Sequence, residues 1–204
     1  MKKILLLFLI IFNTYINYDT KNYIKVNKLD YFKNYYNNSD IIGSIKIDDT
    51  KIDSLLVKSD DNEFYLNHDL YKNFDIKGTI FVDYRVNLNS DQINIYGHNS
   101  NVYDVQFKDL ENYLKKDFYV NHRYINLWDG VNEYIYEIFS IQLINDDYEH
   151  MIVNPKNKID HIKKLSKSIY DTGVNVDIND NILILQTCSY DINGKYILIS
   201  AKKI

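Results

Sequence analysis

The sequence predicts a mainly β domain of the barrel or sandwich type, preceded by a short N-terminal segment. Short apolar runs recur between turn residues from residue 41 onward, a spacing typical of these two architectures. The length of 204 residues fits one domain, with or without a targeting segment. Hydrophobic residues make up 46% of the chain and charged residues 25%, so wholesale disorder is not expected. We find no repeat and no low-complexity linker after residue 40.

The N-terminus resembles a membrane-targeting segment. Lys2 and Lys3 precede an unbroken apolar run over residues 4–12. This run is shorter than the roughly 20 residues of a spanning helix and fits the apolar part of a signal sequence. No small-x-small cleavage site follows it. We therefore expect residues 1–18 to be an uncleaved signal anchor, with the lysines inside the cell and the domain outside. A cleaved signal peptide is the alternative.

Residues 19–40 form the predicted connection between the anchor and the domain. Their apolar side chains recur near helical spacing, at Tyr23, Val26, Leu29, Phe32 and Tyr36. We expect a helical linker here and a single domain over residues 41–204.

The first part of the domain contains three predicted strands. Residues 45–47 and 52–57 read as two short strands around the turn Asp48-Asp49-Thr50. Residues 64–74 form a short helical or irregular stretch. A glycine then opens a third strand over residues 79–83.

The central part contains a strand, a helix and a hairpin. Residues 93–96 are a strand and residues 107–114 a helix. Residues 124–128 and 133–144 are the two strands of the hairpin. Asp129-Gly130 between them is typical of a type I′ turn.

The last part contains the clearest helix and two more strands. Residues 159–170 carry apolar side chains at helical spacing, which predicts an amphipathic helix. Residues 182–185 are continuously apolar, which predicts a strand buried on both faces. Residues 196–201 form the final strand.

Composition excludes several functional classes. The 24 basic residues against 28 acidic residues give a net charge of −4, which argues against a nucleic-acid partner. A single cysteine excludes an intramolecular disulfide and a multi-thiolate zinc site. The five histidines lack metal-ligand spacing. The calcium-loop-like run from Asp177 has no glycine at its sixth position and Cys188 at its twelfth. We expect neither a metal nor another cofactor.

Cys188 is the candidate nucleophile. It ends the apolar strand that begins at Ile182, so its thiol would lie at the rim of a sheet, rigidly held and reachable. A nucleophilic cysteine needs a base or cation nearby to populate its thiolate. The alternative is a small buried hydrophobic residue, which is common for cysteine.

His98 and Lys195 are the candidate partners of this thiol. His98 also ends an apolar strand, in Ile95-Tyr96-Gly97-His98-Asn99, and could act as the base. Lys195 opens the last strand, seven residues after Cys188, and could stabilise an oxyanion if residues 191–194 form a turn. The alternatives are a histidine bonded within a turn and a solvated lysine.

Four motifs in this order resemble the class B sortases, membrane-anchored cysteine transpeptidases of Gram-positive bacteria. The resemblance runs from residue 41 to residue 204. The motifs are residues 57–66, residues 78–85, Tyr96-Gly97-His98-Asn99 and Leu185-Gln186-Thr187-Cys188. The helix at residues 159–170 resembles the extra helix of class B. The family fold implied is a closed eight-stranded β-barrel with an N-terminal helix.

The resemblance also implies an activity and its site. Cys188 would attack the threonine carbonyl of a sorting motif of the Asn-Pro-x-Thr or similar type, and His98 would transfer protons. A peptidoglycan amine would then resolve the acyl-thioester and join a surface protein to the wall. The residues that the resemblance places on the substrate are Asn62, Tyr148, Gln186 and Ser189. The implied location is the cell membrane, with a single span and an extracellular catalytic domain.

One position departs from the family pattern. The family has an arginine at the start of the last strand, where this chain has Lys195, one residue closer to the cysteine than usual. Lysine supplies charge without the planar fork of arginine. Two alternatives therefore stay open, namely a sortase-like cysteine peptidase that releases its acyl group to water and a catalytically silent sortase-like binding domain.

Overall fold

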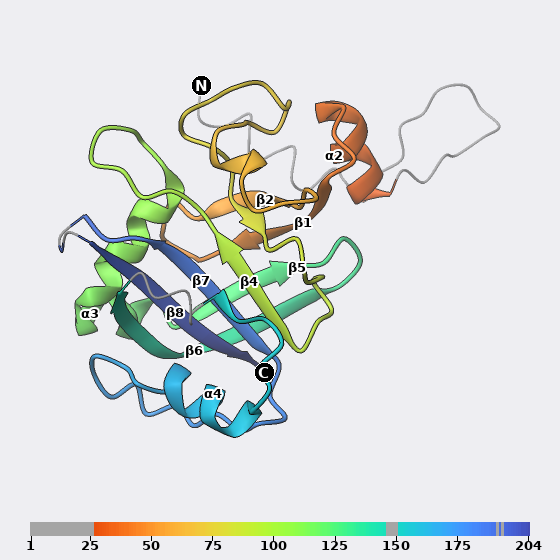
Figure 1. Cartoon of the computed structure of the whole chain (residues 1–204). Coiled ribbons are helices and arrows are strands. Elements are labelled where there is room, and N and C mark those ends of the chain that lie inside the picture. The colour runs from red at the N-terminus through yellow and green to blue at the C-terminus, as the bar shows by residue number, and fades with distance from the viewer. Residues whose placement is uncertain (1–26, 146–150, 191, 193) are drawn as a thin grey trace.

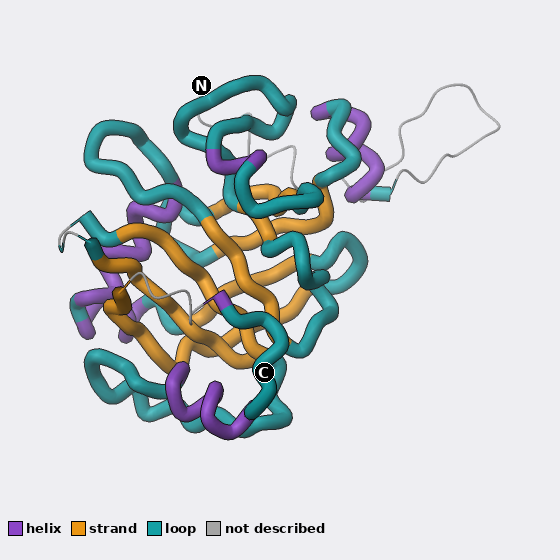
Figure 2. The backbone as a smooth tube through the Cα atoms, viewed as in Figure 1, coloured by secondary structure: helices purple, strands orange, loops and turns teal. Residues whose placement is uncertain are grey.

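Eight strands close into a β-barrel, and helices lie outside it (Figure 1; Figure 2). The computed structural model describes residues 27–145, 151–190, 192 and 194–204. Around the barrel the strand order is β1-β2-β3-β4-β7-β8-β6-β5. The mainly β prediction and the closed eight-stranded barrel are both confirmed.

The strands follow the predicted apolar runs, with different ends. Their bounds are β1 Ile41–Lys46, β2 Asp53–Val57, β3 Phe81–Val82, β4 Gln92–Tyr96, β5 Tyr124–Trp128, β6 Glu133–Asn145, β7 Ile182–Cys188 and β8 Lys195–Lys203. Two neighbouring pairs, β2 with β3 and β4 with β7, are parallel, and the other pairs are antiparallel. The β4–β7 pair joins segments about 90 residues apart in sequence, and its two strands end at the same edge of the sheet.

The helices differ from the predictions in length and type. They are α2 Lys28–Tyr36, the 3-10 helices η1 Phe64–Leu66 and η2 Gln106–Leu114, α3 Lys116–Asn121 and α4 Lys158–Leu165. The predicted helix at residues 107–114 is thus a 3-10 helix, and α3 was not predicted. The predicted helix at residues 159–170 ends earlier, at Leu165. Beyond the helix the Ile169 N–H donates to the Ile141 carbonyl of β6 at 2.8 Å, so the chain there bonds the sheet instead of continuing the helix.

The buried run in β7 packs on two sides. Leu183 and Leu185 belong to the main core inside the barrel. Ile182 and Ile184 face a second cluster that contains Leu165 of α4. Because successive side chains alternate between faces, α4 must cover one face for the whole run to be buried. The prediction of a strand buried on both faces is confirmed.

The hairpin between β5 and β6 is present, but its turn type was predicted wrongly. Trp128 pairs with Glu133, which leaves a four-residue loop. Gly130 has φ of +93°, whereas Asp129 has no positive φ. A type I′ turn requires positive φ at both central residues. Here the Asp129 carboxylate instead accepts hydrogen bonds from the backbone N–H groups of Val131 and Asn132, at 2.8 and 2.7 Å.

The predicted linker is described only from residue 27. Within it α2 begins after Asn27, whose side chain accepts from the Leu29 N–H, and ends at Asn37 in the left-handed conformation. Leu29 and Phe32 pack against a buried cluster around Ile41. The predicted signal anchor, residues 1–18, lies outside the described residues. Over the part of the chain that is described, no helix is both long and apolar enough to cross a membrane.

Candidate active site

Strand register brings His98 and Cys188 to the same edge of the barrel. In the parallel β4–β7 pair, Tyr96 lies beside Gln186. His98 and Cys188 each follow two residues later, so both come at the carboxyl ends of neighbouring strands. His98 is half-buried and Cys188 is exposed. A base and a reachable thiol at one sheet edge is the arrangement that nucleophilic cysteine chemistry needs.

Two hydrogen bonds hold the strand ends together just before these residues. The Gly97 N–H donates to the Gln186 carbonyl at 3.3 Å, and the Thr187 hydroxyl donates to the Gly97 carbonyl at 2.7 Å. A Cβ on Gly97 would lie 2.7 Å from a ring carbon of Phe107, which is itself 1% exposed. Glycine is therefore needed at residue 97, because the strand end lies directly against a buried ring.

The His98 ring is oriented by a backbone carbonyl. Its Nε2 lies 2.6 Å from the carbonyl oxygen of Leu66, in η1. A carbonyl oxygen only accepts, so Nε2 carries the hydrogen of this bond. In the neutral ring Nδ1 is then the unprotonated nitrogen. The connection between β2 and β3 thus fixes which nitrogen can exchange a proton.

Glu111 of η2 bridges the two segments, and the sequence did not single it out. Its carboxylate accepts from the Ser189 hydroxyl at 2.7 Å and from the Tyr190 N–H at 3.2 Å. It also accepts from the side-chain amide of Asn99, which in turn donates to the Cys188 carbonyl at 2.9 Å. No local pattern marks Glu111, because Ser189 and Tyr190 lie 78 and 79 residues away in sequence and Asn99 lies 12 residues away.

Lys195 begins β8, and its ammonium donates to the side-chain oxygen of Asn145 on β6. In the β7–β8 register Cys188 lies opposite Tyr196 rather than opposite Lys195. Paired residues of an antiparallel sheet share a face and successive residues alternate. Lys195 therefore points to the other face of the sheet from Cys188 in this structure. Its predicted role as the oxyanion contact stays a prediction.

The residues expected to bind substrate occupy different environments. Gln186 is 7% exposed, and its side-chain oxygen has no hydrogen-bond partner among the described residues. Ser189 is also 7% exposed and donates to Glu111. The Asn62 amide donates to Asp83 at 3.0 Å and its oxygen accepts from the Tyr84 N–H. Tyr148 lies outside the described residues.

An ion pair between the exposed Arg85 and the buried Asp83 lies beside the outer face of β4. Arg85 donates to both oxygens of Asp83, at 2.8 and 2.6 Å, and to the Met151 carbonyl at 2.7 Å. Burial alone would raise the pKa of Asp83, which is fully buried. Hydrogen bonds from Arg85, Tyr96 and Asn62 outweigh this and hold the pKa below its ordinary value. These bonds stabilise the carboxylate form and fix residue 151 over the sheet.

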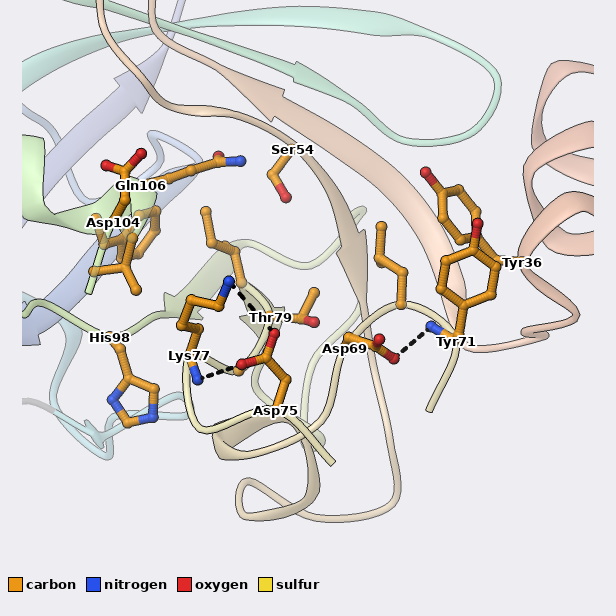
Figure 3. Close-up of a pocket in the computed structure, with 15 residues that line it drawn as sticks. Tyr36, Ser54, Asp69, Tyr71, Asp75, Lys77, Thr79, His98, Asp104 and Gln106 are labelled. Atoms are coloured by element: carbon orange, nitrogen blue, oxygen red, sulfur yellow. Dashed lines mark hydrogen bonds and ion pairs between the residues drawn. The ribbon is translucent and has the colours of Figure 1, made fainter. Parts of the chain in front are cut away.

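A cavity of about 320 Å³ opens on the β3 side of His98 (Figure 3). His98 lies at one edge of it, and Lys77, Asp75 and Thr79 lie next to the histidine in the close-up. Lys77 pairs with Asp75 at 3.8 Å. The cavity is thus open to the His98 side chain. Among the residues with described side chains, no three potential metal ligands converge.

Comparison with known proteins finds two relatives, both of which are named sortase B. Sortase B of Listeria monocytogenes is 36% identical over 159 residues, which cover 74% of this chain and 63% of that protein. Sortase B of Staphylococcus aureus is 32% identical over 179 residues, or 82% of this chain and 71% of that protein. The chain thus spans less than two thirds of the Listeria protein. No protein-family model matches it.

The solved structures agree with these relatives. The X-ray structure of Clostridium perfringens sortase B superposes with a TM-score of 0.79 at 33% identity. The match covers 86% of this chain and 98% of that one, so nearly the whole of that fold is present here.

Proposed function

Because this chain belongs to the class B sortase family, we propose that it is a cysteine transpeptidase that cleaves a sorting motif and attaches the released protein to an amine. The observation that carries the proposal is the register of β4 and β7. It places the chain's one thiol, Cys188, and His98 at the same strand edge.

In the first step the Cys188 thiolate attacks the threonine carbonyl of a motif of the Asn-Pro-x-Thr or similar type. The tetrahedral oxyanion collapses, the peptide bond breaks, and a thioester forms on Cys188. The departing amine takes a proton from His98. Since Leu66 holds Nε2 as a hydrogen-bond donor, Nδ1 is the nitrogen that delivers this proton.

In the second step an amine of peptidoglycan attacks the thioester. His98, now neutral, takes the proton of the incoming amine at Nδ1, and the Cys188 thiolate leaves. Water in place of the amine would give a hydrolase with the same first step. The order of proton transfers is the same for both nucleophiles, so the acceptor decides between them.

The oxyanion of each step needs a donor. Lys195 is the family-position candidate, and its bond to Asn145 would have to break for the ammonium to reach the Cys188 face. The backbone N–H of Ser189 is not available, because it donates to the Lys195 carbonyl at 2.8 Å. A contact of this kind is typically worth about 2.7–4 kcal/mol in the transition state.

We place the enzyme at the cell membrane, with residues 1–18 as anchor and the barrel outside. Lys2 and Lys3 beside the apolar run support this orientation. Its partners would be surface proteins that carry the sorting motif and the peptidoglycan amine.

The test is mass spectrometry of the purified chain after incubation with a panel of sorting-motif peptides, with and without an amine acceptor. We expect a covalent acyl adduct on Cys188 and a ligated product when the amine is present. An adduct that yields only hydrolysed peptide at high amine concentration would favour the hydrolase. A chain that binds a peptide yet never acylates would favour the silent binding domain.

A further inference from the structure

We infer that Glu111 is a positioning residue that sets the separation of His98 and Cys188, an inference that rests on the proposed function. The neighbours of both residues bind the same carboxylate. Asn99, directly after His98, donates to one oxygen of Glu111. Ser189, directly after Cys188, donates to the other oxygen at 2.7 Å.

Further bonds close this arrangement into a network. The Tyr190 N–H lies 3.2 and 3.3 Å from the two carboxylate oxygens. The Asn99 amide also donates to the Cys188 carbonyl at 2.9 Å, so the residue after the histidine contacts the nucleophile's own backbone. Hydrogen bonds to an ionised acceptor are roughly twice as strong as neutral ones. The carboxylate therefore holds Ser189 and Tyr190, which follow the nucleophile, and Asn99, which follows His98, and Asn99 in turn holds the Cys188 carbonyl.

Glu111 is held in a fixed position because the apolar side chains of η2 are buried in the core. Phe107, Leu110 and Tyr113 of this helix are 1%, 0% and 0% exposed. Asn99 and Ser189 are 4% and 7% exposed, so water competes little for their bonds with the carboxylate. In Figure 1 the β7–β8 connection lies beside the segment that carries η2, at the same end of the barrel.

The sheet brings the two residues to one edge, but β4–β7 pairing does not reach them. The last bonds between these two strand ends are those of Gly97 with Gln186 and Thr187. His98 and Cys188 each come one residue later. Cys188 still pairs with Tyr196 of β8, whereas His98 lies beyond the end of β4. From there the two segments are linked through Asn99 and Glu111. A displacement of about 1 Å between reacting groups can cost on the order of 100-fold in rate, so this link bears on catalysis.

The test is Glu111→Gln in the full chain. The amide keeps the size of the side chain but has one accepting oxygen in place of two, so it cannot accept from both Asn99 and Ser189 as the carboxylate does. We expect kcat for a sorting-motif peptide to fall by roughly 10- to 100-fold, with KM changed by less than about threefold because a positioning residue acts on the reacting pair rather than on peptide binding.

A second readout examines the pair without substrate. The rate of Cys188 alkylation by iodoacetamide is measured against pH, because the thiolate is the reacting form and His98 influences its population. We expect the Glu111→Gln profile to shift along the pH axis relative to wild type. A residue that only stabilised the fold would lower the melting temperature and leave this profile in place.

The matched control is Glu137→Gln on β6. Glu137 accepts from Arg123 at 2.7 Å, so the substitution also removes a paired carboxylate. Glu137 pairs with Lys202 of β8, whereas Cys188 pairs with Tyr196 toward the other end of that strand. We expect its kcat and alkylation profile to match wild type. Ser189→Ala removes one donor to Glu111 and tests the same link if Glu111→Gln does not fold, with a smaller loss in kcat expected.

The two hypotheses fail in different ways. Wild-type kcat and a wild-type alkylation profile in both Glu111→Gln and Ser189→Ala would overturn the positioning role. If none of the tested peptides forms an acyl adduct on wild-type Cys188, the proposed function is overturned. A shifted alkylation profile in the variants would still support the positioning of the pair by Glu111.

Discussion

A histidine lies at each end of the β4–β7 pair, and the two histidines differ in burial and in bonding. At the carboxyl ends His98 is half-buried, binds a backbone carbonyl and lies beside an exposed thiol. At the amino ends His161 of α4 is 8% exposed and lies 2.7 Å from the side-chain oxygen of Gln92. Burial, with a smaller contribution from Lys164, lowers the pKa of His161.

The difference shows how one residue type serves in packing at one end of a strand pair and in the proposed chemistry at the other. The amino end is covered by α4, whose Leu165 packs against Ile182 and Ile184. The carboxyl end is left uncovered and is held by polar bonds through Glu111 and Asn99. At the covered end, burial disfavours the protonated form of His161. At the open end, His98 is the residue proposed to exchange protons with substrates.

The largest expected effect comes from removing the nucleophile at the open end. Cys188→Ala should abolish peptide cleavage, because the chain has no second thiol to form the thioester. His98→Ala should cost nearly as much, since residues that act as a unit show non-additive losses. The measurement is peptide cleavage by the single and double variants. Cleavage by His98→Ala close to the wild-type rate would mean that the two do not work together.

Gly97→Ala should disturb the open end next. The added Cβ would meet the buried ring of Phe107 at 2.7 Å, so the strand end must move, at a cost of about 1–3 kcal/mol in stability. His98 would move with it, and kcat should fall by roughly 10-fold or more. Thermal unfolding and peptide cleavage measure the two effects.

The control for this variant is Gly173→Ala. Gly173 has φ of +72° with nothing within 4 Å of its added Cβ, so the substitution strains the backbone without a clash. It should lower stability and leave kcat unchanged. Equal activity in Gly97→Ala and wild type would show that the edge tolerates displacement.

Lys195→Ala tests whether the side chain of Lys195 on β8 takes part in the reaction at the open end. If its ammonium leaves Asn145 to contact the oxyanion, kcat should fall about tenfold or more with a smaller effect on KM, the pattern of a contact made mainly in the transition state. Lys195→Arg should then preserve or raise activity. Steady-state kinetics of both variants decide this, and an alanine variant equal to wild type would make Lys195 a structural partner of Asn145.

The smallest effect belongs to the covered end and appears in stability alone. The folded-state pKa of His161 is lower than the ordinary 6.5. As pH falls below 6.5, the unfolded chain binds a proton that the folded chain does not, so stability is lost toward the folded pKa. His161→Gln should flatten the loss of unfolding free energy between about pH 6.5 and 5 and leave cleavage at neutral pH unchanged.

Other ionisable groups line the cavity next to His161 and could also contribute to the pH dependence of stability. Lys158, Asp91 and Asp180 line it as well. Urea unfolding at several pH values gives the slope for each variant. An unchanged slope in His161→Gln would assign the acid sensitivity to these carboxylates instead.

The barrel strands could be predicted from the sequence because apolar periodicity reports burial directly. The apolar run at the start of β7 and the hairpin of β5 and β6 are examples. The turn at Asp129 was assigned wrongly because the side chain of Asp129 bonds two backbone N–H groups and selects a longer loop. The end of α4 at Leu165 also depends on distant contacts, since the Ile169 N–H bonds the Ile141 carbonyl of β6.

The sequence alone determined the thiol, the histidine and their strands, because a strand-ending cysteine and histidine are local features of the chain. Only the tertiary structure decided that β4 and β7 are parallel neighbours, that Leu66 fixes the hydrogen on His98, and that Glu111 joins the two segments. The tertiary structure also turned Lys195 toward Asn145, through a β7–β8 register that pairs Cys188 with Tyr196. Each of these contacts joins residues that are far apart in sequence. Strand pairing and packing of the whole chain bring such residues together, so no short stretch of sequence determines the contact.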